Sequence, residues 1–352
     1  MLFNQVIFFV YTVYLIIIMN YLLLVPISLL PNSIGLIKEC KNLFCSPILH
    51  NFYYIMKMNM YLSLDKSIRD INKNPDKIDI IMCNHISIYD FLILMALLKE
   101  LDIDYYNFTF RKGVNKNFGL FMVHCDTDIL VDRSWKTDKQ NIDKQLDKIK
   151  ILPKKQVIII YPEGNRINYD RLLASQKYSQ DNDLPIYNNL LTPRVKGIWH
   201  MINKLKDKNM LGNVWDASLI RPNYISNTPN KKILSKTLNW FDMVNNKFDD
   251  YYVIVNKVNY TDNYSNYNKF KSWFYNYWKT KDNIITNYNN ETYYKLNENN
   301  KYSLKNIKYD YFIILFVLLT SLYLLTRKEG RKVIVLLIFL SYIIIFLKKK
   351  ND

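Results

Sequence analysis

The central part of this 352-residue sequence predicts an α/β fold. Short apolar runs typical of strands occur at 78–83, 107–111, 126–132, 156–161, 217–221 and 251–258. Helix-like stretches at 87–100, 134–151 and 195–207 separate several of these runs, and such alternation indicates an α/β domain. With 49% hydrophobic residues, the chain is also long enough to bury a large core.

Residues 5–30 predict an N-terminal transmembrane helix, so that residues 1–39 form a membrane anchor and linker. The run is 26 residues long without a charged side chain, and about 20 apolar residues suffice to cross a bilayer. A cleaved signal peptide is the alternative, but no basic start and no small-residue cleavage site precede Pro31. Since Lys38 and Lys41 follow the run, we expect the next domain to face the cytosol.

The motif N-H-I-S-I-Y-D at 84–90 follows the first predicted strand of the domain. His85 then lies at a strand's carboxyl end, where open α/β sheets bind ligands. The spacing Ser87-x-x-Asp90 predicts a helix N-cap at Ser87, which leaves His85 on the loop before the helix. This loop can fold the imidazole onto the Asp90 carboxylate and leave the other ring nitrogen free to act as a general base. The same residues also suit a purely structural helix start.

A second motif, Y-P-E-G-N-R at 161–166, follows the predicted strand at 156–161. Glu163 and Arg166 would lie at the carboxyl end of that strand, and Gly164 allows the backbone to approach a ligand closely. The forked guanidinium of Arg166 suits a phosphate. A β-turn with a surface ion pair is the alternative interpretation.

Three further basic residues occur at predicted strand ends or helix starts. Arg133 ends the strand at 126–132, and Arg194 and Lys196 flank the start of the helix at 195–207. We expect these side chains to converge with Arg166 on one anionic ligand.

The Asn/Tyr/Lys-rich stretch 259–308 predicts variable surface. Its aromatic residues are expected in the core, among them Trp273, Phe274, Tyr275, Tyr277 and Trp278.

The C-terminal residues 309–352 predict a hydrophobic helical hairpin with a basic tail. Its apolar runs at 311–326 and 333–347 would be about 24 and 22 Å long as helices, short against a hydrocarbon core of ~30 Å. Two full spans would also place the basic connector R-K-E-G-R-K on the far side of the membrane. We therefore favour a shallow or re-entrant hairpin over two full spans.

The whole chain has 48 Lys and Arg against 31 Asp and Glu, a net charge of +17, which predicts an anionic partner. Nucleic acid, a phosphorylated substrate and an anionic lipid surface all fit this charge. The four cysteines have neither zinc-ligand nor paired disulfide spacing, as expected in a reducing compartment.

The ordered motifs resemble the membrane-bound 1-acylglycerol-phosphate acyltransferases. Besides the two motifs above, the resemblance includes Lys112 and Gly119 ahead of V-D-R at 131–133. L-T-P-R-V-K-G at 191–197 and N-V-W-D-A-S-L at 213–219 are most similar to the branch with lysocardiolipin and lysophosphatidylinositol acyltransferases. The resemblance covers roughly residues 75–285 and implies a mixed sheet flanked by helices. We expect the acyltransferase domain to occupy the region between the membrane segments, 40–308, with its motifs within 84–222.

The resemblance also implies a reaction, the transfer of a fatty acyl group from acyl-CoA to the free hydroxyl of a lysophospholipid. His85 would deprotonate that hydroxyl and Asp90 would orient the imidazole. The substrate-binding candidates are Arg133, Glu163, Gly164, Arg166, Arg194 and Lys196. We expect no metal and no cofactor, since acyl-CoA is a substrate.

Several alternatives stay open at this point. The acceptor could be glycerol 3-phosphate, lysophosphatidate, lysophosphatidylinositol or lysocardiolipin. A catalytically inactive membrane protein that binds anionic lipid is a second class of function. We expect no nucleic-acid partner, because the sequence contains no recognisable nucleic-acid module. The expected location is the endoplasmic reticulum or a related internal membrane, where membrane lipids are further partners.

Overall fold

The structure is a computed structural model of the whole chain. It describes residues 35–38, 60–87, 90–111, 128–132, 134–149, 152, 154–221, 251–259 and 266–289. The chain divides into two compact units, and the motifs lie in the unit formed by Phe52–Arg111 and Ile129–Ser303. All strands and helices named below lie in that unit.

The predicted membrane segments at 5–30 and 311–347 lie outside the described residues, and so does Arg133. In the part of the chain that the structure describes, no helix has both the length and the apolar character needed to cross a bilayer.

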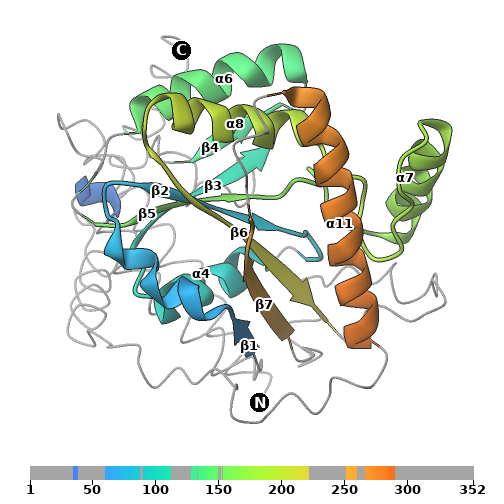
Figure 1. Cartoon of the computed structure of the whole chain (residues 1–352), viewed down its shortest axis with the longest axis horizontal. Coiled ribbons are helices and arrows are strands. Elements are labelled where there is room, and N and C mark those ends of the chain that lie inside the picture. The colour runs from blue at the N-terminus through green and yellow to red at the C-terminus, as the bar shows by residue number, and fades with distance from the viewer. Residues whose placement is uncertain are drawn as a thin grey trace, which may run out of the picture. The chain divides into compact units, whose positions relative to one another are not determined.

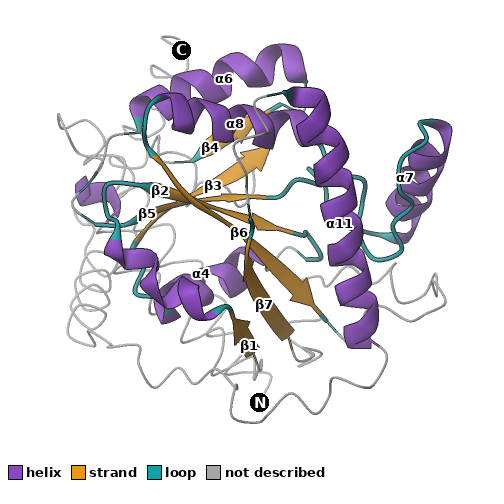
Figure 2. Ribbon diagram, in the orientation of Figure 1, coloured by secondary structure: helices purple, strands orange, loops and turns teal. Residues whose placement is uncertain are grey.

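Within the described residues, one sheet has seven strands in the order β1-β7-β6-β2-β5-β3-β4 (Figures 1 and 2). The strands are β1 Met60–Leu64, β2 Ile78–Cys83, β3 Tyr105–Arg111, β4 Ile129–Val131, β5 Gln156–Ile160, β6 Leu211–Ile220 and β7 Tyr251–Lys257. Strands β6, β2, β5, β3 and β4 run parallel to one another, whereas β7 is antiparallel to β6 and pairs in parallel with β1. The sheet is therefore mixed, which confirms the predicted fold class.

Helices cover both faces of the sheet (Figure 2). They are η2 Lys66–Lys73, α4 Asp90–Glu100, α6 Trp135–Lys148, α7 Tyr169–Asp181, α8 Val195–Asp207 and α11 Tyr267–Asn289. Apolar side chains of α6, α8 and α11 join one core cluster with alternate β2 residues, such as Ile78, Ile80 and Met82. Since side chains alternate along a strand, Ile81 and Cys83 point to the opposite face, where α4 lies (Figure 1).

The central strands bring two predicted motifs together. All residues of β2 and β5 are buried, as expected for parallel strands covered on both faces. Their register pairs Met82 with Ile160, and Met82 also pairs with Asp216 of β6. The loops that follow β2 and β5 therefore start side by side at the same edge of the sheet.

Most predicted elements are confirmed, with corrected ends. The helix predicted from residue 87 is described from Asp90 onward, and the strand predicted at 217–221 begins earlier, at Leu211. Strand β1 and helices η2 and α7 were not predicted. The stretch at 259–308 is not simply variable surface, because residues 267–289 form the helix α11.

The aromatic residues of α11 confirm the expectation of a core position. Phe274, Tyr275 and Trp278 are buried, and Trp273 and Tyr277 pack partly buried against the same cluster.

Candidate active site

The loop after β2 is fixed to the neighbouring strand by Asn84. This amide is buried, and its Nδ2 donates to the carbonyl oxygen of Leu219 at 2.9 Å. The backbone N–H of Leu219 donates in return to Asn84 Oδ1 at 2.8 Å. Asn84 thus continues the β2–β6 pairing by one residue through its side chain, so His85 starts from a fixed position.

The structure brings His85 and Asp90 together. His85 Nδ1 lies 2.8 Å from Asp90 Oδ2, with the histidine side chain 25% exposed and the aspartate side chain 0% exposed. Asp90 also accepts from the backbone N–H of Ile86 at 2.7 Å and from that of Ser87 at 3.0 Å. When Nδ1 donates to Asp90, Nε2 keeps a lone pair and can accept a proton.

Tyr161 and the turn after β5 support His85 from the other side. The Tyr161 ring stacks on the imidazole at a centroid distance of 4.4 Å and an interplanar angle of 29°. The carbonyl oxygen of His85 accepts from the backbone N–H of Ile167 at 2.9 Å. The backbone N–H of His85 donates to Glu163 Oε2 at 2.9 Å. The two motif loops are therefore joined through both backbone polar groups of His85.

Glu163 is buried beneath this turn, with 3% of its surface exposed. Its Oε1 accepts from the backbone N–H of Leu191 at 3.2 Å, so the carboxylate bridges His85 and the chain ahead of α8. Burial raises the pKa of Glu163 to about 8, against the opposing effects of these two N–H groups and of the Lys281 ammonium. The carboxylate therefore faces backbone donors and not solvent.

Gly164 has a left-handed backbone, with φ of +66°. A Cβ at this position would lie 3.0 Å from Cδ and from Nε of Arg194, so glycine permits both the turn and the close approach of that side chain. The backbone N–H of Arg194 donates to the carbonyl oxygen of Pro162 at 2.7 Å. The start of α8 is thereby joined to the turn after β5.

The other basic candidates differ in how the structure places them. Arg166 is half-buried in the turn, and its carbonyl oxygen accepts from Nη1 of Arg171 at 3.0 Å. Lys196 is exposed on the first turn of α8. Arg171 was missed by the sequence reasoning, because the helix α7 that carries it was not predicted.

A buried ion pair lies close to the site between β6 and α11. Lys281 Nζ lies 2.6 Å from Asp216 Oδ1, and it also donates to the carbonyl oxygen of Ala217 at 2.9 Å. The Lys281 ammonium lies over the ring of Trp278, 4.7 Å from the centroid. Asp216 belongs to the motif at 213–219, but only the position of α11 reveals its partner.

Comparisons with known proteins agree with the sequence resemblance. Residues 68–208 match the family model described as Acyltransferase. Lysophosphatidylinositol acyltransferase 10 of Caenorhabditis elegans is 27% identical over 94 residues, which are 27% of this chain and 24% of that protein. Lysocardiolipin acyltransferase 1 of Mus musculus is 26% identical over 106 residues, which are 30% of this chain and 28% of that protein. The matches thus span about a quarter of the length of these relatives.

Among solved structures, the chain is similar to the 1-acyl-sn-glycerophosphate acyltransferase PlsC from Thermotoga maritima. The identity is 12% and the TM-score 0.44, with 84% of this chain and 99% of that chain covered.

Proposed function

We propose that this chain, in which residues 68–208 match the Acyltransferase family model, transfers a fatty acyl group from acyl-CoA to the free hydroxyl of a lysophospholipid. The observation that carries the proposal is the contact between His85 and Asp90, which lies in this domain on the loop after β2. The curated relatives are named for lysophosphatidylinositol, lysocardiolipin and 1-acyl-sn-glycerol 3-phosphate, which is lysophosphatidate, and we propose an acceptor from among these lysophospholipids.

In the proposed mechanism, Nε2 of His85 accepts the proton of the acceptor hydroxyl while the hydroxyl oxygen attacks the thioester carbonyl carbon. Asp90 holds Nδ1–H and stabilises the imidazolium that forms. The carbon–sulfur bond then breaks, and the proton passes from His85 to the departing CoA sulfur. General-base assistance contributes about 10²–10⁴-fold in rate, or roughly 3–5 kcal/mol of the barrier.

Both substrates carry phosphates, and the basic residues around the turn would hold them. We propose Arg166, Arg194 and Lys196 for this role, together with Arg133. Glu163 and Gly164 would shape the acceptor pocket through the backbone that they fix. The proposal needs no cofactor, because the acyl-CoA thioester is itself the activated donor.

The lipid acceptor places this reaction at a membrane. We propose residues 5–30 as a membrane-spanning helix and the runs 311–326 and 333–347 as a shallow or re-entrant membrane hairpin, with the catalytic domain on the cytosolic side of the endoplasmic reticulum or a related membrane.

The test is acyl transfer from labelled acyl-CoA to a panel of lysophospholipids, with membranes that carry the wild type or a variant at equal protein level. His85→Ala should lower the rate by about 10²–10⁴-fold, because it removes the base. His200→Ala is a matched control, since His200 also contacts an aspartate, Asp143, at 2.8 Å but lies on α8 and faces α6. This control should transfer at the wild-type rate.

Two results would contradict the proposal. If the wild type formed no product with any acceptor, the acyltransferase function would be wrong, and binding to anionic vesicles would become the function to test. If activity survived in His85→Ala, acyl transfer would stand but His85 would not be its base.

A further inference from the structure

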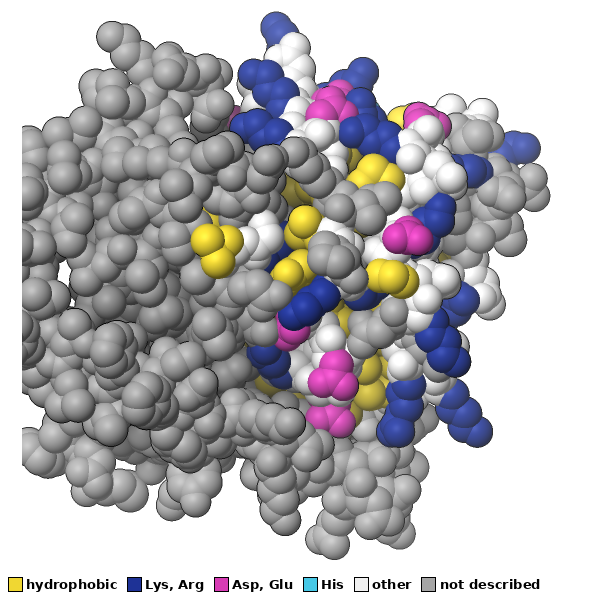
Figure 3. Space-filling model, turned by 90° about the vertical axis from the view of Figure 1, so that its left-hand side faces the viewer, with side chains coloured by type: hydrophobic (Ala, Val, Ile, Leu, Met, Phe, Trp, Pro, Cys, Tyr) yellow, Lys and Arg dark blue, Asp and Glu magenta, His cyan; other side chains and the backbone are white. Residues whose placement is uncertain are grey.

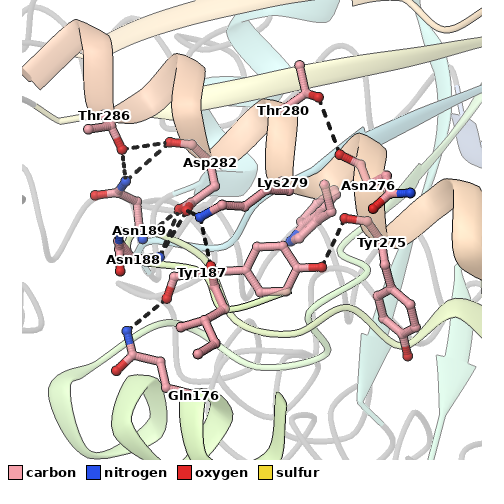
Figure 4. A network of polar contacts seen from close by, with 12 residues as sticks. Gln176, Tyr187, Asn188, Asn189, Tyr275, Asn276, Lys279, Thr280, Asp282 and Thr286 are labelled. Atoms are coloured by element: carbon pink, nitrogen blue, oxygen red, sulfur yellow. Dashed lines mark hydrogen bonds and ion pairs between the residues drawn. The ribbon is translucent and has the colours of Figure 1, made fainter. Parts of the chain in front are cut away.

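Helix α11 lies wholly beyond the region that matches the family model, yet it fixes a segment that leads to the catalytic loop. The segment at 186–191 connects α7 to α8 and contains no helix or strand. Figure 4 shows its polar contacts with α11, which centre on Asp282.

Asp282 is 0% exposed and uses its carboxylate to hold the backbone of this segment. Its Oδ1 accepts from the N–H of Asn189 at 2.7 Å, and its Oδ2 accepts from the N–H of Asn188 at 3.0 Å. Lys279 Nζ lies 3.0 Å from Oδ2 and also donates to the carbonyl oxygen of Ile186 at 2.7 Å. A buried carboxylate is costly unless such donors satisfy it, so these bonds are integral to the fold of the segment.

Further bonds fix the same segment along its length. Asn189 Nδ2 donates to Thr286 Oγ1 at 2.7 Å, and Tyr187 Oη donates to the carbonyl oxygen of Tyr275 at 3.0 Å. From the side of α7, Gln176 Nε2 donates to the carbonyl oxygen of Tyr187 at 2.9 Å (Figure 4). The backbone ahead of Leu191 is therefore held by two helices.

Leu191 connects this segment to the catalytic loop. Its carbonyl oxygen accepts from Trp278 Nε1 at 3.1 Å, and its N–H donates to Glu163 Oε1. The other oxygen of Glu163 accepts the N–H of His85. A continuous series of contacts therefore leads from α11 through Leu191 and Glu163 to the backbone of the histidine.

We propose that Asp282 is a positioning residue for acyl transfer, which acts by holding the 186–191 segment so that Glu163 can fix the backbone of His85. This inference rests on the proposed function for its effect on rate. A small displacement of a reacting group can cost a large factor in rate, so we expect loss of the Asp282 contacts to act mainly on the chemical step.

The test compares Asp282→Asn with Ile285→Val and Ile285→Ala in the full-length protein. The asparagine replaces one acceptor oxygen by an N–H₂ group that faces backbone and lysine donors. Ile285 is 0% exposed on the same helix, and its truncations destabilise the core without removing a bond to the segment. The two truncations differ in severity and are chosen to bracket the fall in melting temperature caused by Asp282→Asn.

At a temperature where all variants are folded, we expect Asp282→Asn to lower kcat roughly tenfold or more, with KM for acyl-CoA little changed. The Ile285 variants should keep the wild-type kcat. Equal loss of kcat in Asp282→Asn and in the Ile285 variant with the same melting temperature would overturn the inference. Should Asp282→Asn fail to fold, Thr286→Val takes its place, because it removes one bond to Asn189. Its kcat is then compared with that of the Ile285 variants in the same way.

Amide hydrogen exchange tests the inference independently of catalysis. Faster exchange at Asn188, Leu191 and His85 in Asp282→Asn, but not in the Ile285 variants, supports the series of contacts. Unchanged exchange at His85 would overturn it. If the wild type proved inactive with every acceptor, the proposed function would fail while exchange at His85 still decided whether α11 fixes this loop.

Discussion

At the scale of single residues, one carboxylate organises the catalytic loop. Asp90 Oδ2 accepts from both His85 Nδ1 and the N–H of Ile86, and Ser87 adds a third donor. The loop backbone and the imidazole of His85 thus share Asp90 Oδ2 as acceptor. If the ring rotated away, the bond between Nδ1 and Asp90 would be lost and no other bond of the loop would replace it. The spacing of four residues between His85 and Asp90 is what allows the loop to wrap around this carboxylate.

Tyr161 combines a supporting ring with an unsatisfied hydroxyl. Its Oη is buried and has no hydrogen-bond partner among the described residues, and burial raises its pKa well above the usual value. Leaving such a hydroxyl unpaired costs about 1–3 kcal/mol, so Tyr161→Phe should raise the free energy of unfolding by about 1 kcal/mol. The ring that stacks on His85 is kept, and the acyl transfer rate should not change. Urea unfolding and the transfer assay measure both effects, and a loss of stability would show that the hydroxyl has a stabilising role.

Sequence patterns could identify the candidate residues and their local partners, but not the partners that lie far away in the sequence. Strand ends and turn chemistry pointed to His85, Asp90 and the turn at 161–166, and the His85–Asp90 contact is local enough to be inferred from spacing. By contrast, the bond from His85 to Glu163 joins residues 78 apart and that of Asn84 joins residues 135 apart. Such pairings depend on strand order, which no local pattern encodes.

At the scale of elements, the same reasoning explains which helices were missed. Helix α7 buries only Leu172 and Ser179, too few apolar positions for a periodic pattern. Helix α11 does carry a periodic face, with Phe270, Phe274 and Trp278 buried at intervals of four residues. The Asn, Tyr and Lys residues between them gave the stretch the composition of a polar surface, and a count of helical spacing would have revealed the face.

The ion pair between Lys281 of α11 and Asp216 of β6 allows the contribution of α11 to the stability of the domain to be measured. Lys281 and Asp216 have side chains 1% and 3% exposed, so Lys281→Met leaves a buried carboxylate without its cation. We expect a loss of about 3–5 kcal/mol in the free energy of unfolding. The double variant Lys281→Met/Asp216→Asn should be more stable than Lys281→Met alone, because the uncompensated charge is gone. Urea unfolding of both variants and of Asp216→Asn checks this, and additive losses would mean that the two charges do not depend on each other.

Across the whole molecule, exposed charges and buried charges have different roles. The chain carries a net charge of +17, and on the described part of the face drawn in Figure 3 many Lys and Arg side chains are exposed, some of them next to hydrophobic side chains. Inside the described unit, each buried acidic residue discussed above has backbone or lysine donors. The surface charge thus favours anionic partners, whereas the buried charges couple the stability of the domain to pH.

Two carboxyl groups, Asp65 and Glu163, make the stability of the domain depend on pH in opposite directions. The Ser67 hydroxyl donates to Asp65 at 2.6 Å and lowers the pKa of that carboxyl, so its contribution is present above the unfolded pKa and is lost as pH falls through the lower, folded value. Glu163 acts at higher pH, because burial raises its pKa from 4.5 to about 8. Between pH 4.5 and about 8, Glu163 is protonated in the folded state but ionised in the unfolded state. Stability from this group is therefore complete below about pH 4.5 and is lost as pH rises to about 8.

Glu163→Gln isolates this effect, because glutamine has the same shape and does not titrate. The groups that face Glu163 are the N–H donors of His85 and Leu191, the Lys281 ammonium and the Asp90 carboxylate. Glutamine replaces one acceptor oxygen by an N–H₂ group, which changes the stability by an amount that does not depend on pH. We expect the stability of the wild type relative to Glu163→Gln to fall with rising pH by at most about 1.4 kcal/mol per pH unit, and to level off above about pH 8. Urea unfolding from pH 5 to 9 measures the difference, in which the other titrating groups cancel. Parallel curves would mean that the two N–H donors and Lys281 outweigh burial, so that Glu163 is ionised throughout this range and holds the backbone of His85 as a carboxylate.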